Sequence, residues 1–244
     1  MKLKDFLLAV RDCLFPQNIT CDICGAEIFD GGHFCKKCAP TVVFNDKTVC
    51  PVCGRKTARA EICIDCKAEA PLYKKGASAL IYSCGGAALV LKFKNGAKYL
   101  KTYLGGLMAE KALALPKCDA VTYVPITRRR KRARGYNQGE LLAAEIAKRL
   151  NIPLVHALKK KRDTDEQKSL SKSERLKNLK GCFEYADRAA VKGKNILLAD
   201  DVLTTGATAE EVCRKLLSAG ARAVYFVTAA SVEYNAKDKT DISK

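Results

Sequence analysis

Short apolar runs alternate with amphipathic segments from about residue 78 to residue 230. Apolar runs of about four to eight residues are typical of strands buried on both faces of a parallel sheet, and apolar residues three or four positions apart are typical of helices. The pattern predicts strands at residues 78–82, 121–126, 154–158, 181–185, 196–199 and 223–229. It predicts helices at residues 87–93, 98–115, 137–150 and 209–219. Strands that alternate with helices predict an α/β fold with a parallel sheet.

Two adjacent carboxylates, Asp200 and Asp201, follow the strand predicted at residues 196–199, which we expect to end at them. Ligands of open α/β sheets bind at the carboxyl ends of the strands, so this acid pair is a candidate site. Two carboxylates there can accept hydrogen bonds from ribose hydroxyls or hold a cation through water.

A loop of small residues comes next and leads into the helix predicted at residues 209–219. The loop consists of Thr204, Thr205, Gly206, Ala207 and Thr208. Hydroxyl groups, a glycine that allows close backbone approach and the free N–H groups of a helix N-terminus together suit a phosphate monoester. With the acid pair, the loop predicts a sugar-phosphate site. The simpler alternative is an ordinary strand–turn–helix unit with a capped helix.

Eight of the 13 cysteines form four Cys-x2-Cys pairs between residues 21 and 66. One pair can hold a tetrahedral ion from a tight turn, and two pairs complete a site, which favours zinc over disulfides. The simplest assignment is sequential, with one zinc on Cys21, Cys24, Cys35 and Cys38 and another on Cys50, Cys53, Cys63 and Cys66. Crossed pairing stays open. Few large apolar residues lie here, so we expect two structural zinc ions to hold the segment folded.

The chain is strongly basic, with 44 Lys and Arg against 26 Asp and Glu and a formal charge of +18 over 244 residues. Eight zinc-bound thiolates would lower this charge to about +14, because each site would carry about −2. A positive chain favours anionic partners such as nucleotides, pyrophosphate or nucleic acid. We find no signal peptide and no apolar run of membrane-spanning length, and with the paired cysteines this predicts a cytoplasmic protein.

Six of the seven residues from 128 to 134 are basic, directly after the strand predicted at residues 121–126. We expect a loop there, either solvated or in contact with a polyanion, and guanidinium groups match diphosphate oxygens well. The candidates for the pyrophosphate side of a substrate, or for DNA, are Arg128, Arg130, Arg132 and Arg134. Lys92 and Lys94 are also near the expected cleft, either as solvated lysines or as ligand contacts.

A long polar stretch without glycine occupies residues 159–180 and includes Gln167, Arg175 and Asn178. A polar excursion of this length between strands of a compact domain is either disorder or a functional lid.

These motifs, in this order, resemble two known patterns. The apolar run, the acid pair and the threonine-rich loop of residues 196–208 resemble the phosphoribosyl-pyrophosphate signature of type I phosphoribosyltransferases. The cysteine ribbons, Arg-Gly-Tyr-Asn-Gln at 134–138, Gln-x2-Leu-x3-Glu-Arg-x2-Asn-Leu at 167–179 and that signature together resemble the ComF family, also called ComF/GntX, of bacterial competence-associated proteins. The resemblance extends from about residue 21 to residue 230.

The resemblance implies a type I phosphoribosyltransferase-like parallel sheet flanked by helices and preceded by a small zinc-ribbon domain. The expected domains are an N-terminal helix with a double zinc ribbon (residues 1–70), the phosphoribosyltransferase-like domain (76–233) and a polar tail (234–244). It further implies that Asp200 and Asp201 hold the ribose hydroxyls of phosphoribosyl pyrophosphate bound with Mg²⁺. The threonine-rich loop would take the 5′-phosphate, the arginine run would act as the pyrophosphate loop, and the polar stretch would close over the substrate.

Two functions follow from the resemblance. The first is transfer of a phosphoribosyl group to an acceptor that the sequence does not identify. The second is a non-catalytic module of natural transformation that binds a nucleotide, single-stranded DNA and DNA-uptake proteins. Base stacking would need exposed aromatic side chains, for which the candidates are Tyr73, Tyr99, Tyr103 and Tyr136.

Overall fold

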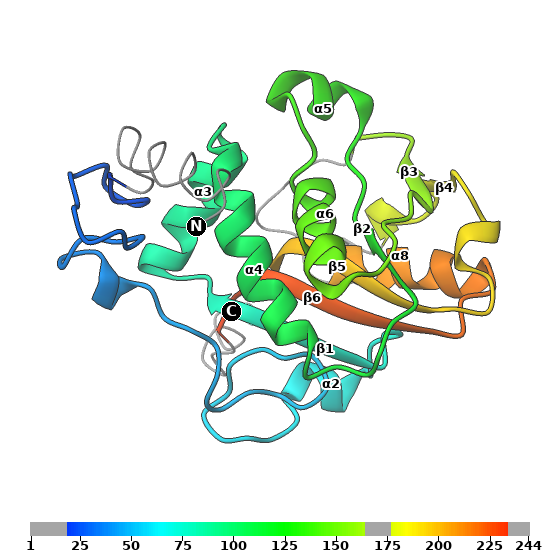
Figure 1. The fold of residues 1–244 in the computed structure, drawn as a ribbon. Helices are drawn as coiled ribbons and strands as arrows, with labels where there is room; N and C mark the ends of the chain where they lie inside the picture. The colour runs from blue at the N-terminus through cyan, green and yellow to red at the C-terminus, as the bar shows by residue number, and fades with distance from the viewer. Residues whose placement is uncertain (1–18, 164–176, 234–244) are drawn as a thin grey trace, which may run out of the picture.

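The computed structural model describes residues 19–163 and 177–233. Within them, four parallel strands form a sheet in the order β1-β6-β5-β2 (Figure 1). The strands are β1 (Lys75–Ile81), β2 (Ala120–Tyr123), β5 (Asn195–Leu203) and β6 (Ala223–Ser231). Because the strands are parallel, their carboxyl ends meet at one edge of the sheet, as predicted for an α/β fold.

Helices cover both faces of this sheet. The helices on one face are α3 (Cys84–Lys94), α4 (Lys101–Ala112) and α6 (Gln138–Leu150). The other face packs against α8 (Ala207–Ser218). The predicted helix at residues 98–115 is shorter than expected at both ends, because its first turn is the 3₁₀-helix η2 (Lys98–Leu100) and α4 ends at Ala112.

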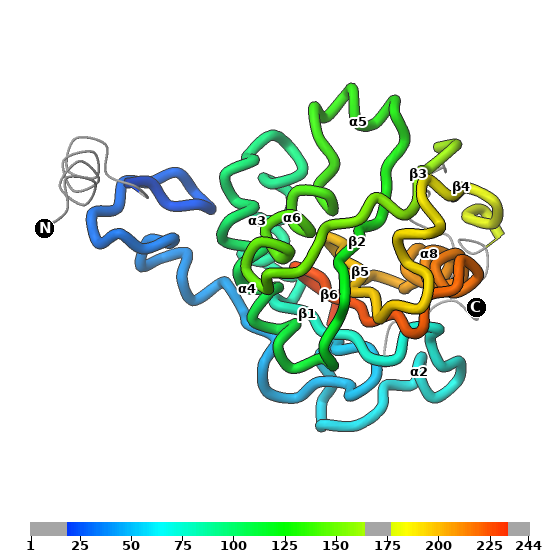
Figure 2. Tube along the Cα trace, turned by 45° about the vertical axis from the view of Figure 1, so that its right-hand side comes forward, coloured from blue at the N-terminus to red at the C-terminus, as the bar shows by residue number. Residues whose placement is uncertain are grey.

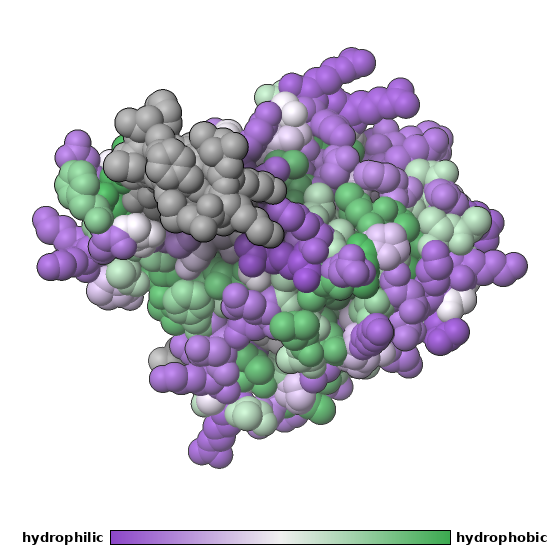
Figure 3. All heavy atoms as spheres, viewed as in Figure 1, coloured by the Kyte–Doolittle hydropathy of each residue, from purple (hydrophilic) through white to green (hydrophobic). Residues whose placement is uncertain are grey.

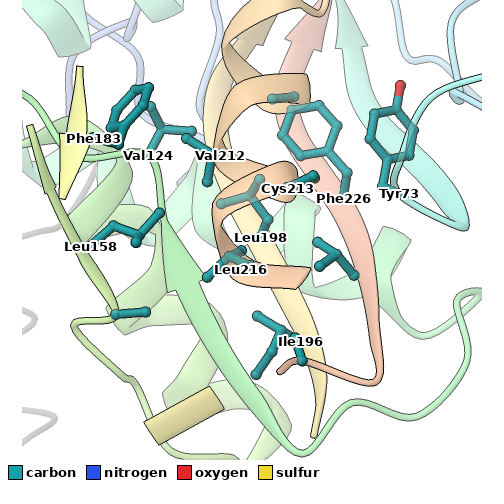
Figure 4. Close-up of a cluster of buried hydrophobic side chains, with 14 of the residues drawn as sticks. Tyr73, Val124, Leu158, Phe183, Ile196, Leu198, Val212, Cys213, Leu216 and Phe226 are labelled. Atoms are coloured by element: carbon teal, nitrogen blue, oxygen red, sulfur yellow. The ribbon is translucent and has the colours of Figure 1, made fainter. Parts of the chain in front are cut away.

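The central strand β5 is buried from both sides, as its apolar run predicted. Ile196 and Leu198 pack in the cluster on the α8 face, while Leu197 and Ala199 pack in the cluster on the opposite face. Successive side chains of a strand point to opposite faces, so one short run supplies both cores. Figure 4 shows the α8 side, where Leu216 of the helix packs with strand residues.

The remaining elements are short. They are η1 (Ala39–Thr41), α2 (Ile64–Ala68), α5 (Arg128–Arg134), β3 (Leu158–Lys160), β4 (Phe183–Tyr185) and η3 (Ala189–Val191). Strands β3 and β4 form an antiparallel pair beside the main sheet. The strand predicted at residues 154–158 is wrong, because only Leu154 bridges to Val121 and β3 begins at Leu158.

Two of the three residues expected in a flexible loop, Gln167 and Arg175, lie outside the described residues. The third, Asn178, is described, and its backbone carbonyl accepts hydrogen bonds from Arg162 Nη2 at 3.2 Å and Cys182 Sγ at 3.1 Å. The predicted N-terminal helix and polar tail also lie outside the described part of the chain. The closing motion of the polar stretch stays a prediction.

The two cysteine ribbons lie at different places on the molecule (Figure 2). The first contacts α4, where the rings of His33 and Phe34 lie 4.1 and 5.5 Å from that of Tyr103. A cavity of about 640 Å³ lies between this ribbon and α4, and its lining includes neither acid of the predicted site. The second ribbon, which includes α2, packs beside β1, so the two ribbons have different neighbours.

Candidate functional site

The acid pair lies within β5, near the edge where the parallel strands end. The expectation that the strand ends at Asp200 and Asp201 is wrong, because pairing with β6 continues to Leu203, which lies opposite Ser231. The length of a strand depends on its neighbour, and β6 extends as far as β5 does. Both carboxylates therefore project from a rigid element and not from a loop.

Lysine side chains from two different elements lie near the acid pair. Lys94 at the end of α3 places its Nζ 3.2 Å from Asp201 Oδ2. The backbone N–H of Asp201 donates to Asp200 Oδ1 at 2.8 Å. Burial and the Asp201 charge raise the pKa of Asp200 to about 8, against the opposing effects of Lys94 and Lys160 of β3. Asp200 therefore holds a proton at neutral pH, which a cation binding at this carboxylate would displace.

We expect the contribution of Asp200 to the free energy of unfolding to fall as the pH rises from about 4 to about 8. The folded protein keeps the Asp200 proton over this range, whereas an unfolded chain with a pKa of 3.8 has lost it. The stabilisation is complete below pH 4 and is lost as the pH passes the folded-state pKa. Asn mimics the protonated acid, so Asp200→Asn should flatten this dependence. Urea unfolding at several pH values measures it, and equal slopes for both proteins would contradict the raised pKa.

The small-residue loop turns directly into α8. Gly206 caps the helix with a φ of +81°, a conformation that glycine adopts at little cost. The helix begins at Ala207 and not at residue 209 as predicted, because Ala207 is already buried against the core. Ala207 and Thr208 therefore belong to the first helical turn, where backbone N–H groups lack helical partners. The loop itself consists of Thr204, Thr205 and Gly206.

The Arg-Gly-Tyr-Asn-Gln segment fixes the end of α3 that carries Lys94. The Tyr136 hydroxyl donates to the Phe93 carbonyl and accepts from the Gly96 N–H at 3.1 Å. Asn137 caps α6, and its Nδ2 donates to the Val124 carbonyl at 3.3 Å. These buried bonds tie α3 to the start of α6. The motif thus has a positioning role toward the acid pair.

The basic run forms the helix α5 and not the predicted loop. Thr127 caps its first turn by accepting from the Arg130 N–H at 3.3 Å, and Gly135 ends it with a φ of +78°. Figure 3 shows hydrophilic side chains over α5 at the top of the molecule. Among the candidate arginines, Arg128 and Arg132 are exposed, whereas Arg130 and Arg134 are partly buried.

Asp163, which sequence reasoning did not select, organises the start of this helix. Its carboxylate accepts from Thr127 Oγ1 at 2.5 Å and pairs with Arg129 Nε at 2.5 Å and Arg130 Nε at 3.3 Å. These bonds lower the pKa of Asp163. The end of the β3 segment is thereby joined to α5.

The cysteines fit two tetrahedral metal sites in the sequential arrangement. In each ribbon the four sulfur atoms lie within 4.8 Å of one another. Cys24 and Cys35 Sγ are 3.7 Å apart, as are Cys53 and Cys63 Sγ. A tetrahedral zinc ion with Zn–S bonds of about 2.3 Å requires sulfur separations of about 3.8 Å. The sulfur atoms are grouped sequentially and not crossed, and the chemistry of four thiolates suits structural zinc.

No sequence pattern predicts that two further residues lie beside the candidate site. Lys160 comes from β3, and Arg55 from the second ribbon donates through Nη2 to the carbonyl of Thr204 in the loop. Both reach the site through tertiary packing between distant segments, which local patterns do not encode. No helix within the described ranges is long and apolar enough to cross a membrane.

Comparison with known proteins agrees with this architecture. The phosphoribosyl transferase domain family matches residues 137–244, and the double zinc ribbon domain family matches residues 10–67. DNA utilization protein YhgH of Escherichia coli (strain K12) is 30% identical over 204 residues, covering 79% of this chain and 88% of the relative. Competence protein ComFC of Bacillus subtilis (strain 168) is 27% identical over 181 residues, covering 70% and 72% of the two chains.

Solved structures match about half of this chain at low sequence identity and low TM-score. Glutamine phosphoribosylpyrophosphate amidotransferase from B. subtilis is 22% identical with a TM-score of 0.40, over 54% of this chain and 26% of that chain. Purine phosphoribosyltransferase from Pyrococcus horikoshii Ot3 is 20% identical with a TM-score of 0.33, over 55% and 84%. The assignment therefore rests on the sequence relatives and on both domain matches, by which this chain belongs to the ComF/GntX family.

Proposed function

We propose that this protein binds phosphoribosyl pyrophosphate at the carboxyl edge of its sheet. The observation that carries the proposal is one continuous segment, in which the acid pair on β5 is followed by a glycine-capped helix N-terminus. The 5′-phosphate would accept hydrogen bonds from the N–H groups of Gly206, Ala207 and Thr208 and from the Thr204, Thr205 and Thr208 hydroxyls. Asp200 and Asp201 would accept from the ribose hydroxyls.

The charges around this segment suit a diphosphate. Carboxylate oxygens are ligands that Mg²⁺ accepts, and Mg²⁺ bound with the substrate would partly neutralise the diphosphate. On the protein side, Lys94 and Lys160 lie near the acids. The pyrophosphate would lie toward Arg128, Arg130, Arg132 and Arg134, where guanidinium groups can donate in pairs to its oxygens.

Group transfer at this site would break the bond between the anomeric carbon and pyrophosphate and form a bond to an acceptor nucleophile. The protein would contribute by fixing the ribose against the acid pair and by stabilising the departing charge. Because Asp200 and Asp201 extend from a buried strand, they are held rigidly enough for such positioning.

Calorimetric titration of the zinc-loaded protein with phosphoribosyl pyrophosphate, with and without Mg²⁺, tests the proposal. We expect one ligand per chain, with clearly tighter binding when Mg²⁺ is present. Repeating the titration at pH 7 in buffers with different ionisation enthalpies should also reveal proton release, because Asp200 must ionise. Absence of binding under both conditions would refute a phosphoribosyl-pyrophosphate site.

We propose a second role in handling single-stranded DNA, in the cytoplasm. Relatives are named for DNA utilization and competence, and helix α5 supplies an exposed basic surface. Of the four tyrosines considered for base stacking, Tyr73 and Tyr136 are buried, whereas Tyr99 is 58% exposed. Tyr99 is therefore the better stacking candidate, and phosphate contacts rather than stacking would supply most of the affinity.

A further inference from the structure

The second ribbon lies directly against the candidate phosphate loop. Arg55, two residues after Cys53, donates through Nη2 to the carbonyl oxygen of Thr204. Its Nη1 pairs with Asp65 Oδ2 at 3.1 Å, and Asp65 is adjacent to Cys66. Arg55 is only 6% exposed although it carries a charge. One guanidinium thus joins a metal-binding ribbon to a loop 149 residues further along the chain.

The backbone that carries Arg55 has little freedom to move. Gly54 has a φ of +73°, and a Cβ there would lie 2.6 Å from Ala77 Cα on β1. Asn45 Nδ2 donates to the Gly54 carbonyl at 2.6 Å, and the Cys50 N–H donates to the Arg55 carbonyl at 2.8 Å. The ribbon turn is therefore fixed to the sheet by close contact. Arg55 is held in place by both the metal-binding turn and β1.

The interface also contains a buried donor and a small space. The Nε of Arg55 has no hydrogen-bond partner within residues 19–163 and 177–233. A cavity of about 30 Å³, enough for one water molecule, lies between the ribbon and the loop. Its lining includes Cys66, Thr205, Gly206 and Glu210. Glu210 accepts from the Leu72 N–H at 3.1 Å, which adds a second link between α8 and the segment after the ribbon.

We propose that Arg55 is a positioning residue for the phosphate loop, and that the second zinc site, unlike the first, sets the geometry of that loop. The inference rests on the proposed function, since it assigns the residue that prepares the 5′-phosphate site. A charged donor on the Thr204 carbonyl fixes the orientation of the peptide that follows. The loop, including the Gly206 N–H of the proposed phosphate site, then keeps a fixed direction before a phosphate arrives, which reduces the cost of ordering the loop on binding.

The test compares Arg55→Gln with Arg59→Gln, which removes an exposed arginine of the same ribbon. The probes are ribose 5-phosphate and inorganic pyrophosphate, titrated by calorimetry. We expect Arg55→Gln to weaken the binding of ribose 5-phosphate by at least about tenfold, which is the effect of one charge-assisted hydrogen bond. Pyrophosphate affinity should stay within about twofold, because it depends on the separate arginine side of the site. Arg59→Gln should change neither affinity.

Backbone hydrogen exchange in the ligand-free protein separates this inference from the proposed function. Faster exchange confined to residues 203–208 in Arg55→Gln supports the positioning role, even if the wild type binds no phosphoribosyl compound. Unchanged exchange, or equal weakening of both probes, overturns it. If Arg55→Gln does not fold, Arg55→Lys is the second variant, because it keeps the buried charge and loses the paired geometry of the guanidinium. An exchange rate at residues 203–208 equal to that of the wild type in this variant would likewise overturn the inference.

Discussion

Replacing Asp200 and Asp201 together by Asn is expected to abolish measurable binding of phosphoribosyl pyrophosphate, a loss of at least about 100-fold. The variant keeps the shapes of both side chains and removes two acceptors of charge-assisted hydrogen bonds and the negative charge that attracts Mg²⁺. Calorimetry under the conditions that give wild-type binding measures the loss. Zinc content should stay at the wild-type value, because neither ribbon includes these residues.

A charge-matched control distinguishes a site effect from a general one. Asp46→Asn removes one exposed acid, which matches the charge change of the Asp200/Asp201 variant at neutral pH, because Asp200 is already protonated there. We expect this control to bind phosphoribosyl pyrophosphate normally. This control and the Asp200/Asp201 variant should bind a labelled single-stranded oligonucleotide similarly in fluorescence anisotropy, because both gain the same charge. The hypothesis of separate phosphate and DNA surfaces would be contradicted if the Asp200/Asp201 variant lost zinc, unfolded or selectively lost DNA affinity.

The sequence predicted the local structure of the candidate site where neighbouring residues determine it. The buried run of β5, the acid pair and the glycine before α8 follow one another, so strand, carboxylates and helix N-terminus are positioned by adjacent residues. The cysteine pairs were similarly predictable, since two sulfurs of one site are only three positions apart, and the structure groups the sulfur atoms as the sequential assignment does. Short-range geometry leaves few alternatives in both cases.

The errors concern properties that depend on distant partners. The end of β5 depends on how far β6 extends, and the conformation of the basic run depends on Thr127 and Gly135 at its ends. The sequence left Lys94 either as a solvated side chain or as a ligand contact. Its ion pair with Asp201 depends on Tyr136, which holds the end of α3 in place. No sequence pattern predicted the contact that Arg55 makes. Its partner is reached only when the ribbon packs on the sheet.

Cys50→Ser and Cys21→Ser are each expected to release about one zinc per chain, but with different consequences. Elemental analysis measures the zinc, and thermal unfolding and calorimetry measure the consequences. Cys50, Cys53 and Cys63 are buried in the same cluster as β5 and α8, so Cys50→Ser should destabilise the phosphate loop and the sheet together. Binding of a structural zinc ion can supply about 10–16 kcal/mol of apparent folding free energy.

Cys21→Ser provides the matched comparison, because Cys21 is the first ligand of the other site and is equally buried. The first ribbon contacts α4 through the ring cluster around Tyr103, and the cavity at this contact is lined by neither acid of the pair. Its loss should therefore leave phosphoribosyl-pyrophosphate affinity near the wild-type value while Cys50→Ser loses it. Equal loss of affinity in both variants would show that zinc acts only on global folding, and an unchanged zinc content would refute the ligand assignment. A difference between them would mean that the two ribbons, similar in sequence, serve different parts of the molecule.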